Sequence, residues 1–355
     1  MSRRPLLDDP ERLSDLDPHG VGQILAEFPV QCRRALALTA SPPLATDVPR
    51  HIVVAGMGGS AVAGDLLRAL ATERLPIPVT VWRGYGVPAF VGAETLVAVV
   101  SYSGNTEETV SALDATLRLG ARCVVLTSGG MLAELVSDRG LPVVSLPGGL
   151  MPRLALGYLF FPLLRLLEST GNPLARESEL EDALRALEAM RNELRPESPQ
   201  PDNEAKRLAL TLAGRIPVIY GTALTDVAAY RWKTEVEEMA KLLAFHGRLP
   251  EAAHNEIEGW RDPLASGFHA VFLRDPEELK ADTTRVRATQ ELIRPHAGGI
   301  TDVWPRGEGR LAHLLSLIYL GDWVSYYLAL LRGADPWPVP VLEEVKRRLR
   351  EGKSP

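Results

Sequence analysis

The sequence predicts an α/β protein with two domains, each an αβα sandwich in which a doubly wound parallel sheet lies between layers of helices. Short apolar runs alternate with helical patterns from His51 to Leu167, and a second alternation of the same kind begins at Ile216. Such alternation is typical of parallel strands joined by helices that cover both faces of the sheet. The proline cluster between Arg195 and Asp202 separates the two series and indicates a linker.

The composition is that of a soluble globular protein. The 355 residues are 46% hydrophobic and 24% charged, which is enough apolar content to bury a core. The formal net charge of −6 argues against nucleic acid or an anionic membrane as a partner. Two cysteines, Cys32 and Cys123, exclude a disulfide framework and a four-thiolate metal site.

The apolar runs do not indicate a secreted or membrane-spanning protein. The start of the chain contains no apolar signal core. The run Leu154–Leu164 is too short to span a bilayer, and the run Leu314–Leu331 carries Asp322 near its middle. We therefore expect a cytoplasmic protein that does not enter a membrane.

The first half of the chain divides into an arm and a first domain. Residues 1–48 are expected to form an N-terminal helical arm, with a helix over roughly 20–38. Residues 49–170 are expected to form the first domain, whose last helix covers 153–167. Its strands are predicted over residues 51–55, 79–82, 95–100, 122–126 and 141–146.

The second half repeats the rhythm with fewer strands. Residues 171–204 are predicted to form a charged helix and linker, residues 205–340 the second domain, and residues 341–355 a basic C-terminal helix. In the second domain, strands are predicted over 216–220, 268–273 and 300–304, and helices over 225–245, 276–293 and 309–332.

A glycine-rich loop, Gly56-Met-Gly-Gly-Ser-Ala61, follows the first strand and opens a helix. Glycines let the backbone approach a phosphate, and the free N–H groups at the helix start face it. The same letters fit the dinucleotide fingerprint, but the second strand ends at Arg83 without the acidic residue that contacts a ribose. Because Arg83 could contact a 2′-phosphate, an NADP enzyme stays open as an alternative. A tight turn that binds no ligand is a further alternative.

A second loop, Ser101-Tyr-Ser-Gly-Asn-Thr106, carries three hydroxyls between a strand and a helix. Hydroxyls and helix-start amides form an uncharged nest that holds a phosphate through hydrogen bonds and the helix dipole. No lysine follows, so the loop is not that of a nucleoside-triphosphate P-loop. An ordinary serine or threonine N-cap would explain one hydroxyl but not three.

Motifs in both halves resemble those of sugar isomerase (SIS) domains. The first half contributes the two loops and Met151-Pro-Arg-Leu-Ala-Leu-Gly-Tyr158. The second half contributes Arg231-Trp-Lys-Thr-Glu235, Ala253-His-Asn-Glu-Ile-Glu-Gly-Trp260 and Gly321-Asp-Trp-Val-Ser-Tyr-Tyr-Leu-Ala329. Over roughly residues 50–350, the set resembles the bifunctional phosphoglucose/phosphomannose isomerases of archaea and some bacteria.

The resemblance implies two flavodoxin-like SIS domains in a homodimer that works without metal or another cofactor. It implies interconversion of glucose 6-phosphate, and also mannose 6-phosphate, with fructose 6-phosphate through a cis-enediol. Six residues of the two loops would bind the phosphosugar: Gly58, Gly59, Ser60, Ser101, Ser103 and Thr106. Four residues are matched to catalytic roles: Arg153, Glu238, His254 and Lys346.

These four residue types suit aldose–ketose isomerisation. One carboxylate, Glu238, can take the proton from one carbon and return it to the next. Arg153 is permanently charged and can stabilise the enediolate oxygen. His254 titrates in the range needed to open a cyclic sugar, and Lys346 would assist. The family commonly has asparagine on both sides of the base, where this chain has Glu237 and Met239, and its N-terminal extension is longer than in compact members.

Other interpretations of the same residues stay open. Glu238 shares a helix face with Arg231, Thr234 and Lys241, so a solvated, salt-bridged surface would have the same pattern. Glu237 would either raise the pKa of the base or face solvent. In the same alternative, His254 would only cap the turn at Asn255, and Lys346 would be an ordinary lysine of an amphipathic helix. At the level of the whole chain, a non-catalytic SIS protein that senses a phosphosugar is the main alternative to an enzyme.

Overall fold

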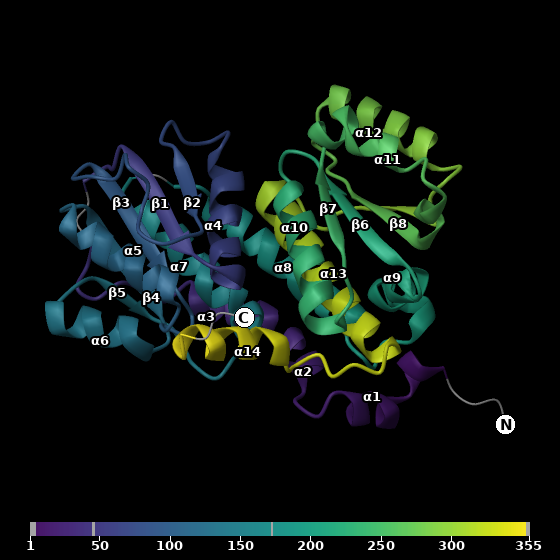
Figure 1. Cartoon of the computed structure of the whole chain (residues 1–355), viewed down its shortest axis with the longest axis horizontal. Coiled ribbons are helices and arrows are strands. Elements are labelled where there is room, and N and C mark those ends of the chain that lie inside the picture. Colours follow the sequence, from purple (N-terminus) through teal and green to yellow (C-terminus); the bar gives the residue numbers. More distant parts are fainter. Residues whose placement is uncertain (1–4, 45–46, 172, 353–355) are drawn as a thin grey trace.

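The computed structural model describes residues 5–44, 47–171 and 173–352. The chain folds around two parallel sheets that stand side by side, each with its own helices (Figure 1). This arrangement confirms the predicted α/β class with two parallel sheets. Residues 1–4, 45–46 and 353–355, which belong to the predicted arm and C-terminal segment, lie outside the described part of the chain.

The first sheet has five parallel strands in the order β2-β1-β3-β4-β5. Alternate residues point to opposite faces, so that Ile52 and Leu96 pack with α4 and α7, whereas Val53 and Val97 pack with α5 and α6. The elements are β1 (His51–Gly56), α4 (Gly58–Ala71), β2 (Val79–Trp82), β3 (Thr95–Val100), α5 (Glu107–Arg118), β4 (Arg122–Thr127), α6 (Gly130–Arg139), β5 (Val143–Ser145), η2 (Pro152–Ala155) and α7 (Leu156–Ser169).

The second sheet has four parallel strands in the order β7-β6-β8-β9. Ile219 and Val271 face the core that includes α10 and α13, and Val218 and Phe272 face α12. The elements are α9 (Glu204–Leu212), β6 (Ile216–Gly221), α10 (Asp226–Ala240), β7 (Phe245–Arg248), η4 (Glu251–His254), α11 (Glu256–Gly259), η5 (Pro263–Gly267), β8 (Phe268–Leu273), α12 (Lys280–Ile293), β9 (Gly299–Val303) and α13 (Gly309–Leu331).

Strand β7 corrects the predicted helix over residues 225–245. Helix α10 ends at Ala240 because the next residue, Lys241, has a left-handed backbone with φ 52°. The chain then turns, and β7 pairs with β6 at the edge of the sheet. The helical spacing of apolar residues continues to Leu243, which concealed the turn, but Leu243 is exposed beyond the helix end.

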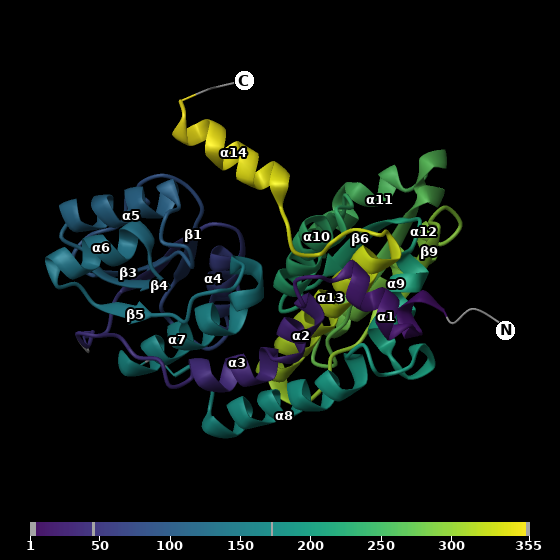
Figure 2. The same cartoon turned by 90° about the horizontal axis from the view of Figure 1, so that it is seen from below.

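The arm and the charged segment differ from the prediction in detail. The arm holds η1 (Leu6–Asp8) and three short helices, α1 (Pro10–Leu16), α2 (Val21–Ala26) and α3 (Phe28–Ala35), instead of one helix over 20–38. Pro29 in the first turn of α3 starts a new helix there. Helix α8 (Glu177–Leu194) packs on α3 and α13, and η3 (Gln200–Asp202) follows it. Together α8 and the arm run beneath both sheets (Figure 2).

Helix α13 lies at the centre of the second half. Its length and hydropathy suffice to cross a membrane, but 94% of its apolar window is buried inside the protein. It packs against α8, α9 and α10, and the aromatic residues Trp323, Tyr326 and Tyr327 are buried. These aromatic residues belong to the main core, and α13 is the core helix of a globular fold.

The last helix, α14 (Pro340–Arg350), projects away from the body of the molecule (Figure 2). A connection over residues 333–339, which we call the strap, joins it to α13. Val341, Val345 and Leu349 lie on α14, and each is at least half exposed. The described part of the chain therefore leaves an apolar face of this helix uncovered.

Candidate active site

The two predicted ligand loops and the turn before α7 meet at the carboxyl edge of the first sheet. Gly58 begins α4 with φ 50°, and the Ser60 hydroxyl accepts a hydrogen bond from the Tyr102 N–H at 3.3 Å. A side chain at Gly59 would lie 3.1 Å from the Pro152 carbonyl oxygen, in the turn that carries Arg153. The glycine loop therefore touches both the hydroxyl loop and the turn of Arg153.

The three hydroxyls of the second loop lie around the start of α5. Ser101 Oγ donates to Thr106 Oγ1 at 3.2 Å and accepts from the Gly104 N–H, also at 3.2 Å. Ser103 is exposed, and its hydroxyl accepts from the Asn105 N–H at 3.4 Å. Thr106 occupies the N-cap position, but its side chain makes no capping hydrogen bond. The hydroxyl of Thr106 is thus available to a ligand, unlike that of an ordinary N-cap.

Gly104 gives the hydroxyl loop its shape, and replacing it with alanine is expected to lower the free energy of unfolding by about 1–3 kcal/mol. The residue has φ 69°, and an added Cβ would overlap the Gly129 carbonyl oxygen and lie 2.8 Å from Thr127 Oγ1. Urea unfolding of Gly104→Ala measures the loss. Gly120→Ala is the matched control, because Gly120 has φ 65° but no neighbour within 4 Å of an added Cβ. Equal losses in both variants would contradict the assigned contact.

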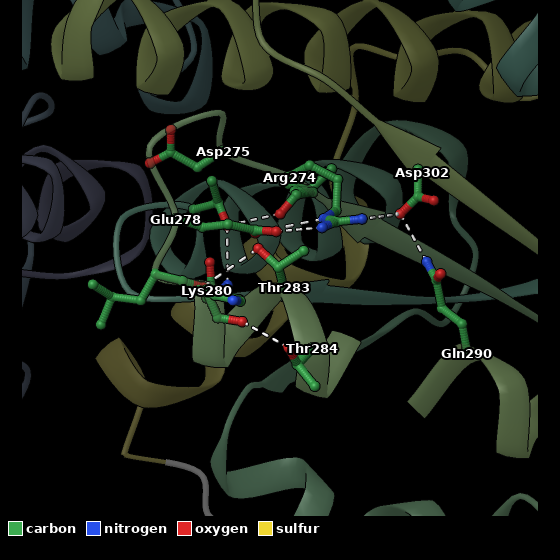
Figure 3. Close-up of polar contacts among 12 residues, drawn as sticks. Arg274, Asp275, Glu278, Lys280, Thr283, Thr284, Gln290 and Asp302 are labelled. Atoms are coloured by element: carbon green, nitrogen blue, oxygen red, sulfur yellow. Dashed lines mark hydrogen bonds and ion pairs between the residues drawn. The ribbon is translucent and has the colours of Figure 1, made fainter. Parts of the chain in front are cut away.

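The corresponding edge of the second sheet holds a polar cluster in which one arginine faces two carboxylates (Figure 3). Arg274, which follows β8, pairs with Glu278 and lies 3.2 Å from Asp302 Oδ1. Gln290 Nε2 donates to the same Asp302 oxygen at 2.7 Å. Because this arginine is already paired with two carboxylates, the cluster is poorly suited to an anionic ligand.

Arg153 is only 3% exposed and joins the two halves of the chain. Its Nη1 lies 3.5 Å from Glu238 Oε2 on α10. Its Nη2 donates to two strap carbonyls, those of Pro336 at 2.7 Å and Trp337 at 2.6 Å. Its own carbonyl accepts from Arg231 Nη2 at 2.6 Å. The structure therefore brings the predicted arginine and the predicted carboxylate together from different halves of the sequence.

The Glu238 side chain is 27% exposed, so solvent and a ligand can reach it. Its ion-pair partner is Arg153 of the first half and not a neighbour on its own helix. The adjacent Glu237 pairs with Lys233 at 2.7 Å, and Met239 is buried. The carboxylate that replaces a family asparagine therefore belongs to a separate helix-surface ion pair.

A buried charge network beneath this pair was not predicted. Arg231, which the alternative of a solvated surface would expose, is only 1% exposed, so that alternative does not hold for this residue. Its Nε donates to Asp322 Oδ1 at 3.2 Å, and its Nη1 lies 2.8 Å from Glu235 Oε1. The spacing of Arg231 and Glu235 by one helical turn was visible in the sequence, but the charge within the apolar run of α13 was the stronger signal.

Glu235 is expected to make the protein less stable as the pH rises. Burial raises the pKa of Glu235 to about 8 from its ordinary 4.5. Burial also raises the pKa of Asp322, but two hydrogen bonds from Arg231 favour its charged form, whereas Glu235 Oε2 has no partner among the described residues. Of the two buried carboxyl groups, Glu235 is therefore the one that we expect to be protonated.

Between about pH 4.5 and about pH 8 the native protein holds this proton and the unfolded chain loses it, so the free energy of unfolding falls with rising pH. Urea unfolding across that window should show the decline. The variant Glu235→Gln keeps the neutral form at every pH and should flatten it. An unchanged slope in Glu235→Gln would assign the decline to other groups.

The other two predicted catalytic residues do not join the pair within one chain. His254 is exposed on η4, and its imidazole makes no hydrogen bond or ion pair with any described residue. Lys346 is exposed on α14 and has none within the described part of the chain. The local role considered for His254 is filled by Asn255, which caps α11 through the Glu256 N–H.

Arg83, which the NADP alternative required, is paired with Asp65 of α4. The guanidinium carbon of Arg83 also lies 5.7 Å from the centre of the Tyr230 ring, which belongs to α10. The ion pair with Asp65 lies within the first half, and the contact with Tyr230 joins the two halves. The geometry thus gives this arginine a packing role that needs no cofactor phosphate.

Comparisons with known proteins agree with this geometry. Residues 201–349 match the family model of the bacterial phospho-glucose isomerase C-terminal SIS domain. The bifunctional phosphoglucose/phosphomannose isomerase of Caldicellulosiruptor bescii is 42% identical over 305 residues, which cover 85% of this chain and 90% of that protein. The D-glucosamine-6-phosphate 4-epimerase of Sulfolobus acidocaldarius is 33% identical over 258 residues, covering 71% and 78%. A glucose-6-phosphate isomerase like protein from Thermus thermophilus shares the fold, with a TM-score of 0.65 at 24% identity over 97% and 99% of the two chains.

Proposed function

Because this chain belongs to the bifunctional phosphoglucose/phosphomannose isomerase family, we propose that it interconverts glucose 6-phosphate, and also mannose 6-phosphate, with fructose 6-phosphate in the cytoplasm. The observation that carries the proposal is the ion pair of Arg153 with Glu238, 3.5 Å apart. The pair lies beside a turn that the glycine loop contacts directly. An anion-binding edge and an accessible carboxylate are what a phosphosugar isomerase needs.

In the proposed mechanism the hydroxyl loop holds the phosphate and the carboxylate moves one proton. Ser101, Ser103 and Thr106 bind the phosphate with the helix-start amides of α5. Glu238 takes the proton from C2 of the open-chain aldose and returns it to C1, while a hydroxyl proton moves from O2 to O1. Arg153 stabilises the negative oxygen of the enediolate between the two steps. Epimers at C2 share this intermediate, so both aldoses give the same ketose.

We propose further that the active form is a homodimer in which His254 opens the ring of a sugar bound by the other subunit. Its imidazole is exposed and forms no hydrogen bond or ion pair with Arg153 or Glu238 of its own chain. Near β7, Leu243, Phe245 and Leu264 are 69%, 48% and 76% exposed, which provides apolar surface for a second copy.

Mixing two inactive variants tests this arrangement. A heterodimer of Glu238→Gln with His254→Ala contains one site with both native groups only if His254 acts across the interface. Activity on cyclic substrate should therefore reappear on mixing and subunit exchange, while each variant alone stays inactive. No recovery in an exchanged dimer would place His254 in its own subunit's site.

The proposed reaction is tested by coupled assays of fructose 6-phosphate conversion to glucose 6-phosphate and mannose 6-phosphate. Conversion supports the enzyme. Thermal stabilisation by fructose 6-phosphate without conversion would favour the non-catalytic phosphosugar sensor instead. D-glucosamine 6-phosphate belongs in the same assay, since one relative is named as its 4-epimerase. Turnover of the amino sugar alone would contradict the proposed substrate class.

A further inference from the structure

The N-terminal arm holds the turn that carries Arg153. Gln31 on α3 is buried, and its Nε2 donates to the Leu154 carbonyl at 2.9 Å. Its Oε1 accepts from the Gly157 N–H at 2.7 Å. Leu154 directly follows the arginine, and Gly157 lies in the first turn of α7. One side chain of the arm therefore fixes the backbone on the C-terminal side of Arg153.

The arm also holds the strap, whose carbonyls bind the other end of Arg153. The His19 ring stacks on the Trp337 ring, with centres 5.4 Å apart and planes at 12°. His19 Nδ1 lies 3.2 Å from Asp335 Oδ2, and Asp335 Oδ1 accepts from the Trp337 N–H at 2.9 Å. The carbonyl of the same tryptophan accepts from Arg153 Nη2. His19 therefore holds the strap in the position from which its carbonyls accept hydrogen bonds from the Arg153 guanidinium.

The arm is itself anchored to the core helix. The Tyr326 hydroxyl on α13 donates to Asp17 Oδ2 at 3.0 Å, and the Tyr319 hydroxyl donates to the Leu25 carbonyl at 2.9 Å. The Asp17 carboxylate also accepts from two N–H groups at the start of α2, at 2.8 and 2.9 Å. Because α13 is buried, these bonds give the arm a fixed position relative to both sheets.

We infer that the N-terminal arm is a positioning element for Arg153, acting through Gln31 on its backbone and through His19 on the strap that receives its guanidinium. The inference rests on the proposed function, in which Arg153 must meet an oxygen of the enediolate. A displacement of about 1 Å far from the reacting atoms can lower turnover by about 10²-fold.

The test compares kcat and KM for fructose 6-phosphate in His19→Ala and Gln31→Met. We expect kcat to fall about fivefold in His19→Ala and about fiftyfold in Gln31→Met. We expect KM to change less than about twofold, since the hydroxyl loop is untouched. His296→Ala is the matched control, because His296 is exposed and its side chain makes no hydrogen bond, ion pair or ring contact with the described residues. Wild-type kcat in both arm variants would overturn the inference.

A second part of the experiment separates the positioning of Arg153 from a general loss of stability. In an Arg153→Met background, the arm variants should reduce kcat no further, because the group that they position is absent. Undiminished additional losses in that background would overturn the inference. His19 is on the surface, with 47% of its side chain exposed, so His19→Ala keeps the test available if Gln31→Met does not fold.

Amide hydrogen exchange provides a readout that does not depend on turnover. Exchange of the peptide over residues 153–158 should quicken in Gln31→Met, and that of the strap peptide in His19→Ala, relative to His296→Ala. Unchanged exchange in both would overturn the inference. If the wild-type protein isomerises none of the sugar phosphates, the proposed function fails, and the exchange experiment still decides whether the arm holds the arginine.

Discussion

Replacing Glu238 with glutamine is expected to lower kcat for fructose 6-phosphate by about 10²–10⁴-fold, the typical contribution of a general base. The amide has the shape of the carboxylate but cannot take a proton from carbon. Arg153 stays in place through its two bonds to the strap, so the binding site is otherwise intact. Coupled kinetics measure turnover, and isothermal titration with fructose 6-phosphate should show affinity within about threefold of wild type.

Glu237→Gln is the matched control for this substitution. Its carboxylate is one position away on the same helix, but it pairs with Lys233. The control should keep wild-type kcat, since an exposed ion pair of this kind contributes little. Full activity in Glu238→Gln would remove this residue from the mechanism, and a loss of sugar-phosphate binding would show that its role lies in binding.

Replacing Asp322 with alanine is expected to lower the free energy of unfolding by about 3–5 kcal/mol, the cost of leaving a buried charge without its partner. Arg231 would keep only Glu235, which must then lose its proton to compensate. Because Arg231 also donates to the Arg153 carbonyl, the reaction centre should be disturbed as well. Urea unfolding measures the stability, and kcat measures the second effect.

Asp114→Ala provides the comparison, since Asp114 pairs with Arg118 at 2.6 Å on an exposed helix surface. Its loss should cost less than about 1 kcal/mol. The double variant Arg231→Met, Asp322→Leu removes both charges and should recover part of the stability lost in Asp322→Ala. Similar small losses for Asp322 and Asp114 would show that the buried pair contributes no more than a surface pair.

The strands of the first sheet could be read from sequence because burial on both faces requires continuous apolar runs, such as Leu96–Val100. The edge strand β7 escaped because Phe245-His-Gly-Arg248 is only partly buried and has no such run. Lys241 did not indicate the end of the helix, because lysine favours helices and its residue type does not reveal the left-handed backbone that it adopts here. The edge strand β2 is also only partly buried, but it was predicted because Val79-Thr-Val-Trp82 is a run of β-branched and aromatic residues, which β7 lacks.

The candidate site likewise has a part that the sequence predicted and a part that it did not. Each of the two loops is a contiguous stretch of sequence, so the spacing within each loop was enough to group its residues. Arg153 and Glu238 are far apart in the chain, and of the sequence features only the family resemblance pairs them. The contribution of Gln31 could not be inferred, because it acts through packing that no local pattern encodes. Asp322 within an apolar run did signal a buried charge, but not that Arg231 is its partner.

The boundary between the two halves has an evolutionary consequence, because the proposed anchor for the phosphate and the carboxylate proposed to move the proton come from opposite sides of it. A recombination event within residues 195–202 would join an anchor from one ancestor to a base from another while leaving each sheet whole. Natural selection on such chimaeras would act on a few positions that face each other, Arg153 and Arg231 first among them. Such an exchange would also have to preserve the packing of α8 and of the arm on α13, since both precede the linker and contact the second half.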